Sequence, residues 1–159
     1  MTRPEGYYAD AERKIPRPAL FDAEAQAEAE LWKDVKSSQL RRFFGQVMAD
    51  RRQFEIKGKE ARDEEAQVAM ALLKAGAAYA AARDPARKAM ADFAAHHAGL
   101  VRTVTDFRVF ARHFEAVVAW HKVFEKARDE QARQARAGVG NAPRPGGGRG
   151  PQGGHHERR

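Results

Sequence analysis

The chain has 159 residues, which is enough for one domain with a modest core but not for two. Lysine and arginine exceed the acidic residues by seven, a balance that favours a polyanionic partner because phosphates attract a basic surface at long range. Cysteine is absent and no apolar run approaches the roughly 18 residues of a membrane span, so disulfides, thiolate metal sites and a membrane partner are excluded, and we expect a soluble, cytoplasmic protein.

Residues 1–21 are expected to form no stable structure. Prolines and a glycine lie among charged residues, and such a composition cannot bury enough apolar surface to offset the entropy of ordering. Tyr7 and Tyr8 could stack on a base or a partner surface, but isolated aromatic residues in an arm usually contact nothing specific. We therefore predict a flexible N-terminal arm.

From Asp22 onward the pattern predicts an all-α fold, a compact bundle of about five helices over residues 22–137. Asp22 caps an alanine- and glutamate-rich helix, and a second helix begins at Gln39. A third, alanine-dominated helix extends from about Glu60 to Asp84, where Asp84 and the following proline start the fourth. The second helix has an apolar stripe of Leu40, Phe43, Phe44, Val47, Met48 and Phe54, and the third has a narrow seam of Ala69, Leu72, Leu73, Gly76, Ala77 and Ala80.

The last helix, centred on residues 105–126, has two distinct faces. Its apolar face is expected to be buried and consists of Phe107, Phe110, Phe114, Val117, Val118, His121 and Phe124. Its basic face consists of Arg108, Arg112, Lys122 and Lys126, which fall within roughly 40° of a common line at about 100° per residue, interrupted by Glu115. This helix is therefore predicted to anchor in the core while presenting a cationic ridge to a ligand.

Arginines also accompany the apolar stripe of the second helix. Arg41 and Arg42 could reach phosphate oxygens with their planar guanidinium groups. Alternatively, Arg41 and Arg52 are surface residues that form ion pairs with Asp50 or Glu55. The two interpretations have equal weight at this point.

Residues 138–159 are dense in glycine and proline and are predicted to form a disordered basic tail. A solubilising linker is the first interpretation, and weak affinity for single-stranded nucleic acid is the second.

The sequence contains no arrangement typical of an active site. It has no Gly-rich phosphate loop and no HExxH motif, and its few serines lack motif context. His97 and His121 lie within apolar stripes, but no carboxylate shares either stripe at ligand spacing, so we interpret both as core histidines with one hydrogen bond each. We predict no catalysis, no cofactor and no metal site.

Three segments carry a resemblance to a known family: SQLRRFF at residues 38–44, AYAAAR at 78–83 and FEAVVAWHK at 114–122. Their sequences, order and separations resemble the motifs of the small subunit of type III-A CRISPR effector complexes, the Csm complex. The last segment is the most specific, and the resemblance extends over about residues 31–127.

The resemblance implies a compact, non-catalytic helical subunit that takes part in antiviral defence. Several copies would stack along the complex beside its backbone and large subunits, and would help to hold the guide CRISPR RNA and the target RNA. Carried over residue by residue, it assigns RNA binding to Arg41, Arg42, Arg83 and Lys122. Arg108, Arg112 and Lys126 are added from the ridge.

We therefore expect a sequence-indifferent RNA-binding subunit that neutralises phosphates without reading bases. One alternative is a sequence-independent DNA-binding protein, although no helix-turn-helix pattern is evident. A second is a protein-only helical adaptor that docks through Trp120, Val109 and Val123.

Overall fold

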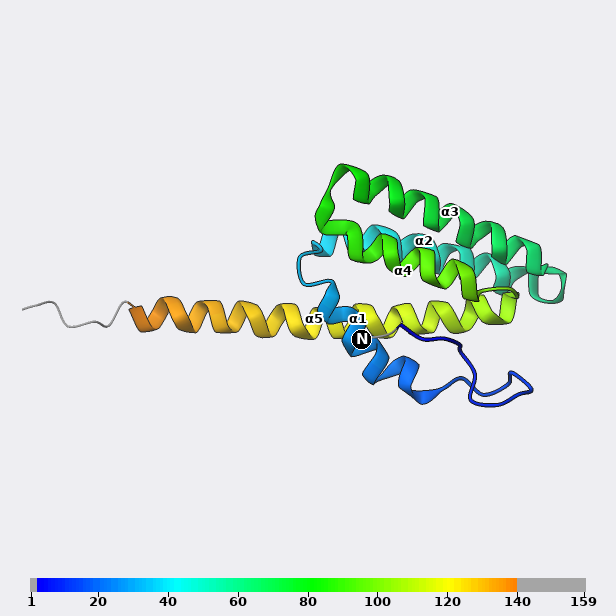
Figure 1. Cartoon of the computed structure of the whole chain (residues 1–159), viewed down its shortest axis with the longest axis horizontal. Coiled ribbons are helices and arrows are strands. Elements are labelled where there is room, and N and C mark those ends of the chain that lie inside the picture. The colour runs from blue at the N-terminus through cyan, green and yellow to red at the C-terminus, as the bar shows by residue number, and fades with distance from the viewer. Residues whose placement is uncertain (1–2, 140–159) are drawn as a thin grey trace, which may run out of the picture. The chain divides into compact units, whose positions relative to one another are not determined.

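The computed structural model describes residues 3–139, and the all-α prediction is confirmed: this part of the chain contains five α-helices and no β-strand (Figure 1). The helices are α1 (Ala23–Leu31), α2 (Ser37–Lys57), α3 (Asp63–Arg83), α4 (Lys88–Leu100) and α5 (Val104–Val139). Short 3-10 helices lie at Pro18–Phe21, Gly58–Glu60 and Pro85–Arg87. No described helix is long and apolar enough to span a membrane.

The chain divides into two units, residues 1–127 and residues 128–159. The first unit contains α1 to α4 and most of α5. Of the second unit, the structure describes only the end of α5, in which residues 129–139 are all exposed. Of the predicted tail 138–159, residues 138–139 are the end of α5, and residues 140–159 lie outside the described residues.

The first part of α5 forms the centre of the bundle, as its apolar periodicity predicted. Its buried face contacts aromatic side chains of α2, of α4 and of Trp32, which directly follows α1. Two contacts set the edge of one ring against the face of the other: Phe107 meets Phe54 of α2 at 5.1 Å, and Phe114 meets Trp32 at 5.6 Å. Phe93 of α4 packs on Phe114 at 5.4 Å. Aromatic pairs in these geometries stabilise the fold beyond the contribution of burying the rings. Every predicted stripe residue of α5 is buried except Phe124, which is partly buried.

α3 packs along α4 on the side of α2 and α4 that is away from the central part of α5 (Figure 1). Three of its five buried side chains are alanines, so the two helices can approach closely at those positions. The predicted seam is partly wrong, because Leu72 and Gly76 are exposed. The contact is shifted by one position around the helix and uses Ala66, Met70, Leu73, Ala77 and Ala80.

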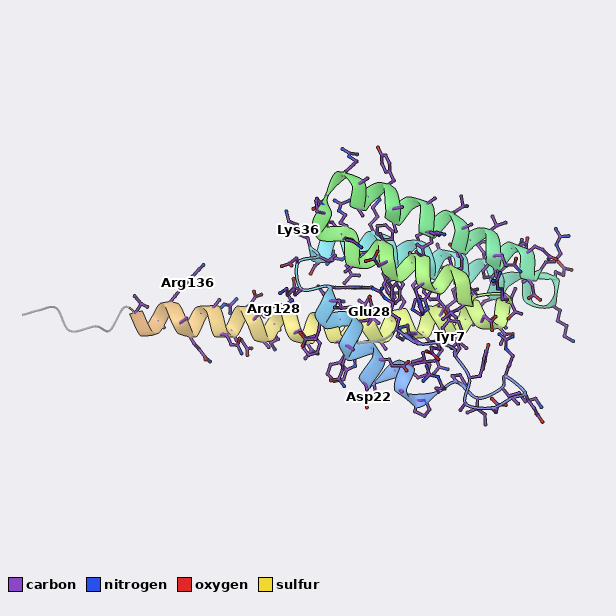
Figure 2. All side chains as sticks on the ribbon, in the orientation of Figure 1. Tyr7, Asp22, Glu28, Lys36, Arg128 and Arg136 are labelled. Carbon is purple, nitrogen blue, oxygen red and sulfur yellow. The ribbon has the colours of Figure 1, made fainter. Side chains whose placement is uncertain are left out.

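Residues 3–21, for which the sequence suggested a flexible arm, pack against the rest of the first unit (Figure 2). Tyr7 is 2% exposed and Leu20 is fully buried. Arg3 donates two hydrogen bonds of 2.9 Å to the buried carboxylate of Glu28, which also accepts a hydrogen bond from the Trp32 indole. Charge-assisted hydrogen bonds and buried rings together offset the entropy cost of ordering this segment.

A second anchor of the same segment is Asp106, at the start of α5. Its carboxylate accepts hydrogen bonds from the Tyr8 hydroxyl at 2.8 Å, from Arg13 at 2.7 Å and from the backbone N–H groups of Arg102 and Thr103. Burial alone would raise the pKa of Asp106, but the hydrogen bonds from Arg102, Tyr8 and Arg13 and the charge of Arg13 outweigh it and lower the pKa. The carboxylate therefore joins the N-terminal segment to the helix start, where an anion is favoured.

Candidate functional site

The four basic residues predicted on α5 lie along one continuous helix, on the face opposite its buried stripe. Arg112, Lys122 and Lys126 are exposed, and Arg108 is half-buried. We call these four residues the α5 ridge. In the described part of the chain none of them forms an ion pair, so their charge is available to an external anion.

Two neighbouring elements shape the beginning of the α5 ridge. The guanidinium of Arg112 lies 5.2 Å from the centre of the Phe21 ring, a cation–π contact that orients the group and leaves its N–H donors free. Arg108 borders a shallow depression of about 440 Å³ that Lys59 also lines. The Nε of Arg108 is buried there and has no hydrogen-bond partner among the described residues.

Glu115 is the acidic residue that interrupts the α5 ridge, and α2 partly neutralises it. Arg51 of α2 lies 3.8 Å from the Glu115 carboxylate while its Nε donates to Glu55 at 3.0 Å. Because the Glu115 carboxylate lies close to the Arg51 guanidinium, it reduces the positive potential of the α5 ridge less than an unpaired carboxylate would.

The ion pairs proposed as the alternative role of Arg41 and Arg52 are wrong. Glu55 forms its ion pair with Arg51, and the Asp50 carboxylate accepts hydrogen bonds from Gln46. Arg41 and Arg52 are both exposed, and neither forms an ion pair within residues 3–139.

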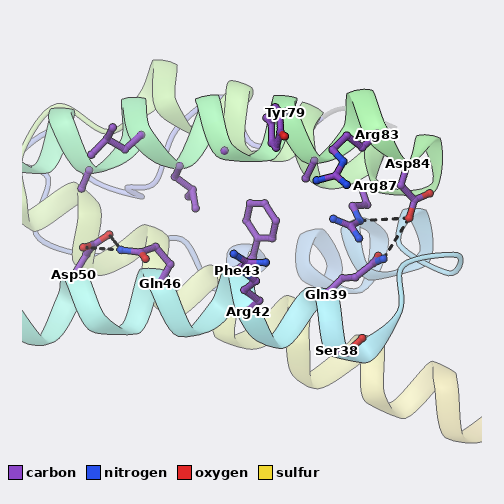
Figure 3. Close-up of a pocket in the computed structure, with 15 residues that line it drawn as sticks. Ser38, Gln39, Arg42, Phe43, Gln46, Asp50, Tyr79, Arg83, Asp84 and Arg87 are labelled. Carbon is purple, nitrogen blue, oxygen red and sulfur yellow. Dashed lines mark hydrogen bonds and ion pairs between the residues drawn. The ribbon is translucent and has the colours of Figure 1, made fainter.

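Arg42 and Arg83 lie away from the α5 ridge, on opposite walls of a groove between α2 and α3 (Figure 3). The groove has a volume of about 910 Å³. Arg83 lies 5.8 Å from the centre of the Tyr79 ring on the same helix. Phe43 extends from α2 toward α3 between the two walls, which makes the middle of the groove aromatic. The seven predicted RNA-binding residues thus fall into a ridge, a groove and the separate exposed residue Arg41.

One end of the groove is bordered by Asp84, which caps the 3-10 helix Pro85–Arg87 that precedes α4. Asp84 accepts a hydrogen bond from the backbone N–H of Ala86, as the sequence predicted for a helix start. Its carboxylate also accepts from Gln39 of α2 at 3.2 Å and pairs with Arg87 at 3.3 Å (Figure 3). These hydrogen bonds lower the pKa of Asp84, the one from Ala86 most.

The histidines of the apolar stripes are core residues, as predicted. His97 is fully buried and its Nδ1 is hydrogen-bonded to the Tyr7 hydroxyl at 2.7 Å, and Nε2 of His121 donates to the Trp32 carbonyl at 3.1 Å. His113, which the sequence analysis missed, is equally buried and its Nδ1 donates to the Leu20 carbonyl at 2.6 Å. Burial lowers the pKa of His97 and His113. Within residues 3–139, no group of three histidine or acidic side chains could hold a metal ion.

The apolar patch proposed for an adaptor is partly wrong. Val109 is 6% exposed, on the side of α5 where residues 3–21 contact Asp106 and His113. Trp120 is partly buried and stacks on Phe124 at 5.9 Å, while Val123 remains exposed. The burial of Val109 could not be read from the sequence, since the covering residues 3–21 had no apolar periodicity.

The chain was compared with protein families, curated proteins and solved structures. A family model described as Csm2 Type III-A matches residues 16–127, about the region in which the three sequence motifs lie. No curated protein and no solved structure matches the chain. Residues 3–15, which carry Tyr7 and Arg3, lie before the matched range.

Proposed function

The chain belongs to the Csm2 Type III-A family, the small subunits of type III-A CRISPR effector complexes, and on this premise we propose that it binds RNA in that complex through the α5 ridge. In this role it is a non-catalytic, cytoplasmic subunit. Several copies lie along the complex beside its backbone and large subunits, in contact with the guide CRISPR RNA and the target RNA.

The observation that carries the proposal is the arrangement of charge on α5. Arg112, Lys122 and Lys126 are exposed on the free face of a helix whose opposite face is fixed in the core. A row of cations on a rigid helix neutralises successive phosphates without contacting base edges. Such binding accepts any guide and any target, because base pairing between the two strands supplies the specificity.

Arg41 is exposed on α2 and is included in the proposal as a further phosphate contact. Arg108 is included as a half-buried residue at the beginning of the ridge. Arg42 and Arg83 border the groove between α2 and α3, and a different ligand for that groove is argued in the next subsection.

Charge reversal on the ridge tests the proposal. The complex is assembled with the triple variant Arg112→Glu, Lys122→Glu and Lys126→Glu, and its affinity for target RNA is measured between about 50 and about 300 mM salt, over which the Debye length falls from about 14 to about 6 Å. We expect a loss of at least about tenfold, and a slope of log affinity against log salt that is shallower by about 2.

The matched control reverses Lys14, Lys33 and Lys74, three exposed lysines that lie outside the ridge. It makes the same change in net charge and should leave the affinity within about twofold of the unmodified complex. Equal losses in the two triple variants would show that net charge, and not the ridge, governs binding. Tighter binding of duplex DNA than of random single-stranded RNA at one salt concentration would instead favour the DNA-binding alternative.

A further inference from the structure

α3 has two apolar faces, and only one of them is covered. The buried face packs on α4. On the other face, Val68, Leu72 and Tyr79 are 58%, 69% and 66% exposed. They are four and seven residues apart, so they share one side of the helix. Large apolar side chains that are exposed in a row at helical spacing are typical of a docking surface rather than of scattered surface residues.

Two members of this row border the groove between α2 and α3. Leu72 and Tyr79 lie on its α3 wall, and Phe43 lies on its α2 wall (Figure 3). Gly76 lies between Leu72 and Tyr79, and Ala69 lies one turn before Leu72, so the α3 wall has small residues beside its large apolar ones. The middle of the groove can therefore bury apolar side chains of a segment that enters between the two helices.

The charges at the ends of the groove are unequal. Near Asp84, Arg42 and Arg83 form no ion pair or side-chain hydrogen bond within residues 3–139, whereas Arg87 is paired with Asp84. At the other end Asp50 accepts hydrogen bonds from Gln46, and burial raises its pKa. One end thus offers two free guanidinium groups, which suit carboxylates in a bidentate geometry.

A third group at the arginine end favours a peptide as the ligand. Gln39 donates its amide N–H to Asp84, and its Oε1 is buried without a hydrogen-bond partner among the described residues. A buried acceptor of this kind is satisfied by an N–H donor, which every peptide bond supplies.

Two other occupants fit less well. The chain's own residues 140–159 contain more arginines than acidic residues, so Arg42 and Arg83 would repel them. An RNA strand would satisfy the arginines and could stack on Tyr79, but phosphates gain nothing from the exposed aliphatic side chains of Val68 and Leu72.

From these contacts we infer that the groove between α2 and α3 is a docking site for a segment of another protein subunit, one that carries apolar side chains next to a carboxylate. The carboxylate pairs with Arg42 and Arg83, and the apolar side chains pack on Leu72, Tyr79 and Phe43. The inference rests on the proposed function in one respect, that the chain works inside a multi-subunit complex.

Site-specific crosslinking tests the occupant directly. Leu72 is replaced by the photoreactive residue benzoylphenylalanine, and the complex is assembled from the co-expressed subunits and guide RNA and irradiated. We expect a crosslink to a peptide of a different subunit that contains Asp or Glu beside apolar residues. A crosslink to RNA, to a second copy of this chain or to a peptide without an acidic residue would overturn the inference, as would the absence of any crosslink.

Substitutions separate this site from the α5 ridge. Leu72→Ser should lower the fraction of the chain retained in the complex by about tenfold or more, without changing the RNA affinity of the isolated chain or its melting temperature. Arg42→Glu combined with Arg83→Glu should give the same loss of assembly. The matched control is Val123→Ser, which removes an exposed apolar side chain elsewhere and should leave assembly unchanged.

The ridge variants give the independent readout. If they bind RNA normally while Leu72→Ser prevents assembly, the proposed RNA contact fails and the docking site stands. If Leu72→Ser and both groove arginine substitutions assemble normally, the docking site fails whatever the ridge variants do.

Discussion

The Tyr7 hydroxyl is hydrogen-bonded to Nδ1 of His97 at 2.7 Å, across 90 residues of sequence. The two rings are nearly parallel, with their centres 5.8 Å apart, and both side chains are buried. Burial raises the pKa of Tyr7 and lowers that of His97, so both groups are neutral near pH 7. This contact makes the N-terminal segment part of the core.

The first prediction concerns the contribution of Tyr7. Tyr7→Phe leaves Nδ1 of His97 without its partner and should lower the free energy of unfolding by about 1 to 2 kcal/mol. Tyr7→Ala also removes a buried ring and should cost about 3 to 5 kcal/mol. Urea unfolding of the full chain measures both changes. Tyr79→Phe, at an exposed position, is the control and should change stability by less than about 0.5 kcal/mol. Wild-type stability of Tyr7→Ala would contradict the packing of residues 3–21.

The second prediction concerns acid pH. His97 and His113 have pKa values below the ordinary value of 6.5 in the folded chain, because burial disfavours the charged ring. Below pH 6.5 the unfolded chain binds protons that the folded chain does not, so stability is full above this pH and is lost as the pH falls. Each histidine should contribute a slope of up to about 1.4 kcal/mol per pH unit.

Unfolding curves at pH 7.5, 6.5 and 5.5 measure that slope. His97→Gln removes one titrating ring while keeping a polar group near Tyr7, and should reduce the slope by about one proton. Identical pH dependence in the variant and the original chain would exclude His97 as a source of acid sensitivity.

The third prediction concerns the ion pair between Arg3 and Glu28. Glu28 is 4% exposed, so Arg3→Ala leaves a buried carboxylate with only the Trp32 indole as a side-chain partner. We expect a loss of about 3 kcal/mol in the free energy of unfolding. Adding Glu28→Gln removes the uncompensated charge and should restore part of the loss. A double variant that is less stable than Arg3→Ala would argue against charge burial as the cause.

The fourth prediction concerns the cap at Asp84. Asp84→Ala removes the acceptor for the Ala86 N–H and should cost about 1 kcal/mol. Asp92→Ala removes a carboxylate that pairs with the exposed Lys88 on the same helix and should cost less than about 0.5 kcal/mol. Thermal unfolding compares the two. A cap effect no larger than the ion-pair effect would mean that Asp84 does not stabilise the start of the helix.

The fifth prediction concerns Glu115 and follows from the proposed RNA contact. Glu115→Gln removes the acidic interruption of the α5 ridge, so RNA affinity should rise roughly two- to fivefold at low salt and less at high salt. The matched control is Glu64→Gln, an exposed carboxylate on α3. A rise of the same size in both variants would show a general charge effect rather than an effect of the ridge.

The amino-acid sequence by itself determined the helical class, the buried face of α5 and the cap at Asp84, although Asp84 caps a 3-10 helix and α4 itself begins at Lys88. These features depend on local periodicity and on the capping chemistry of Asp84, both of which are encoded in neighbouring residues. The same periodicity placed Arg108, Arg112, Lys122 and Lys126 on one side of α5, and the family motifs lie within the range that the Csm2 Type III-A model matches.

Only the tertiary structure decided which surfaces the rest of the chain covers. The N-terminal segment is ordered by partners 25 to 98 residues away in sequence, such as Glu28 for Arg3 and Asp106 for Tyr8. Contacts over such separations cannot be predicted from the pattern of neighbouring residues. Likewise, α3 has apolar residues on two faces, and the face that is buried is the one that packs on α4. Leu72 was left exposed and Arg42 and Arg83 were separated from the ridge for the same reason: packing between distant elements, rather than helical spacing, fixes which side chains reach solvent.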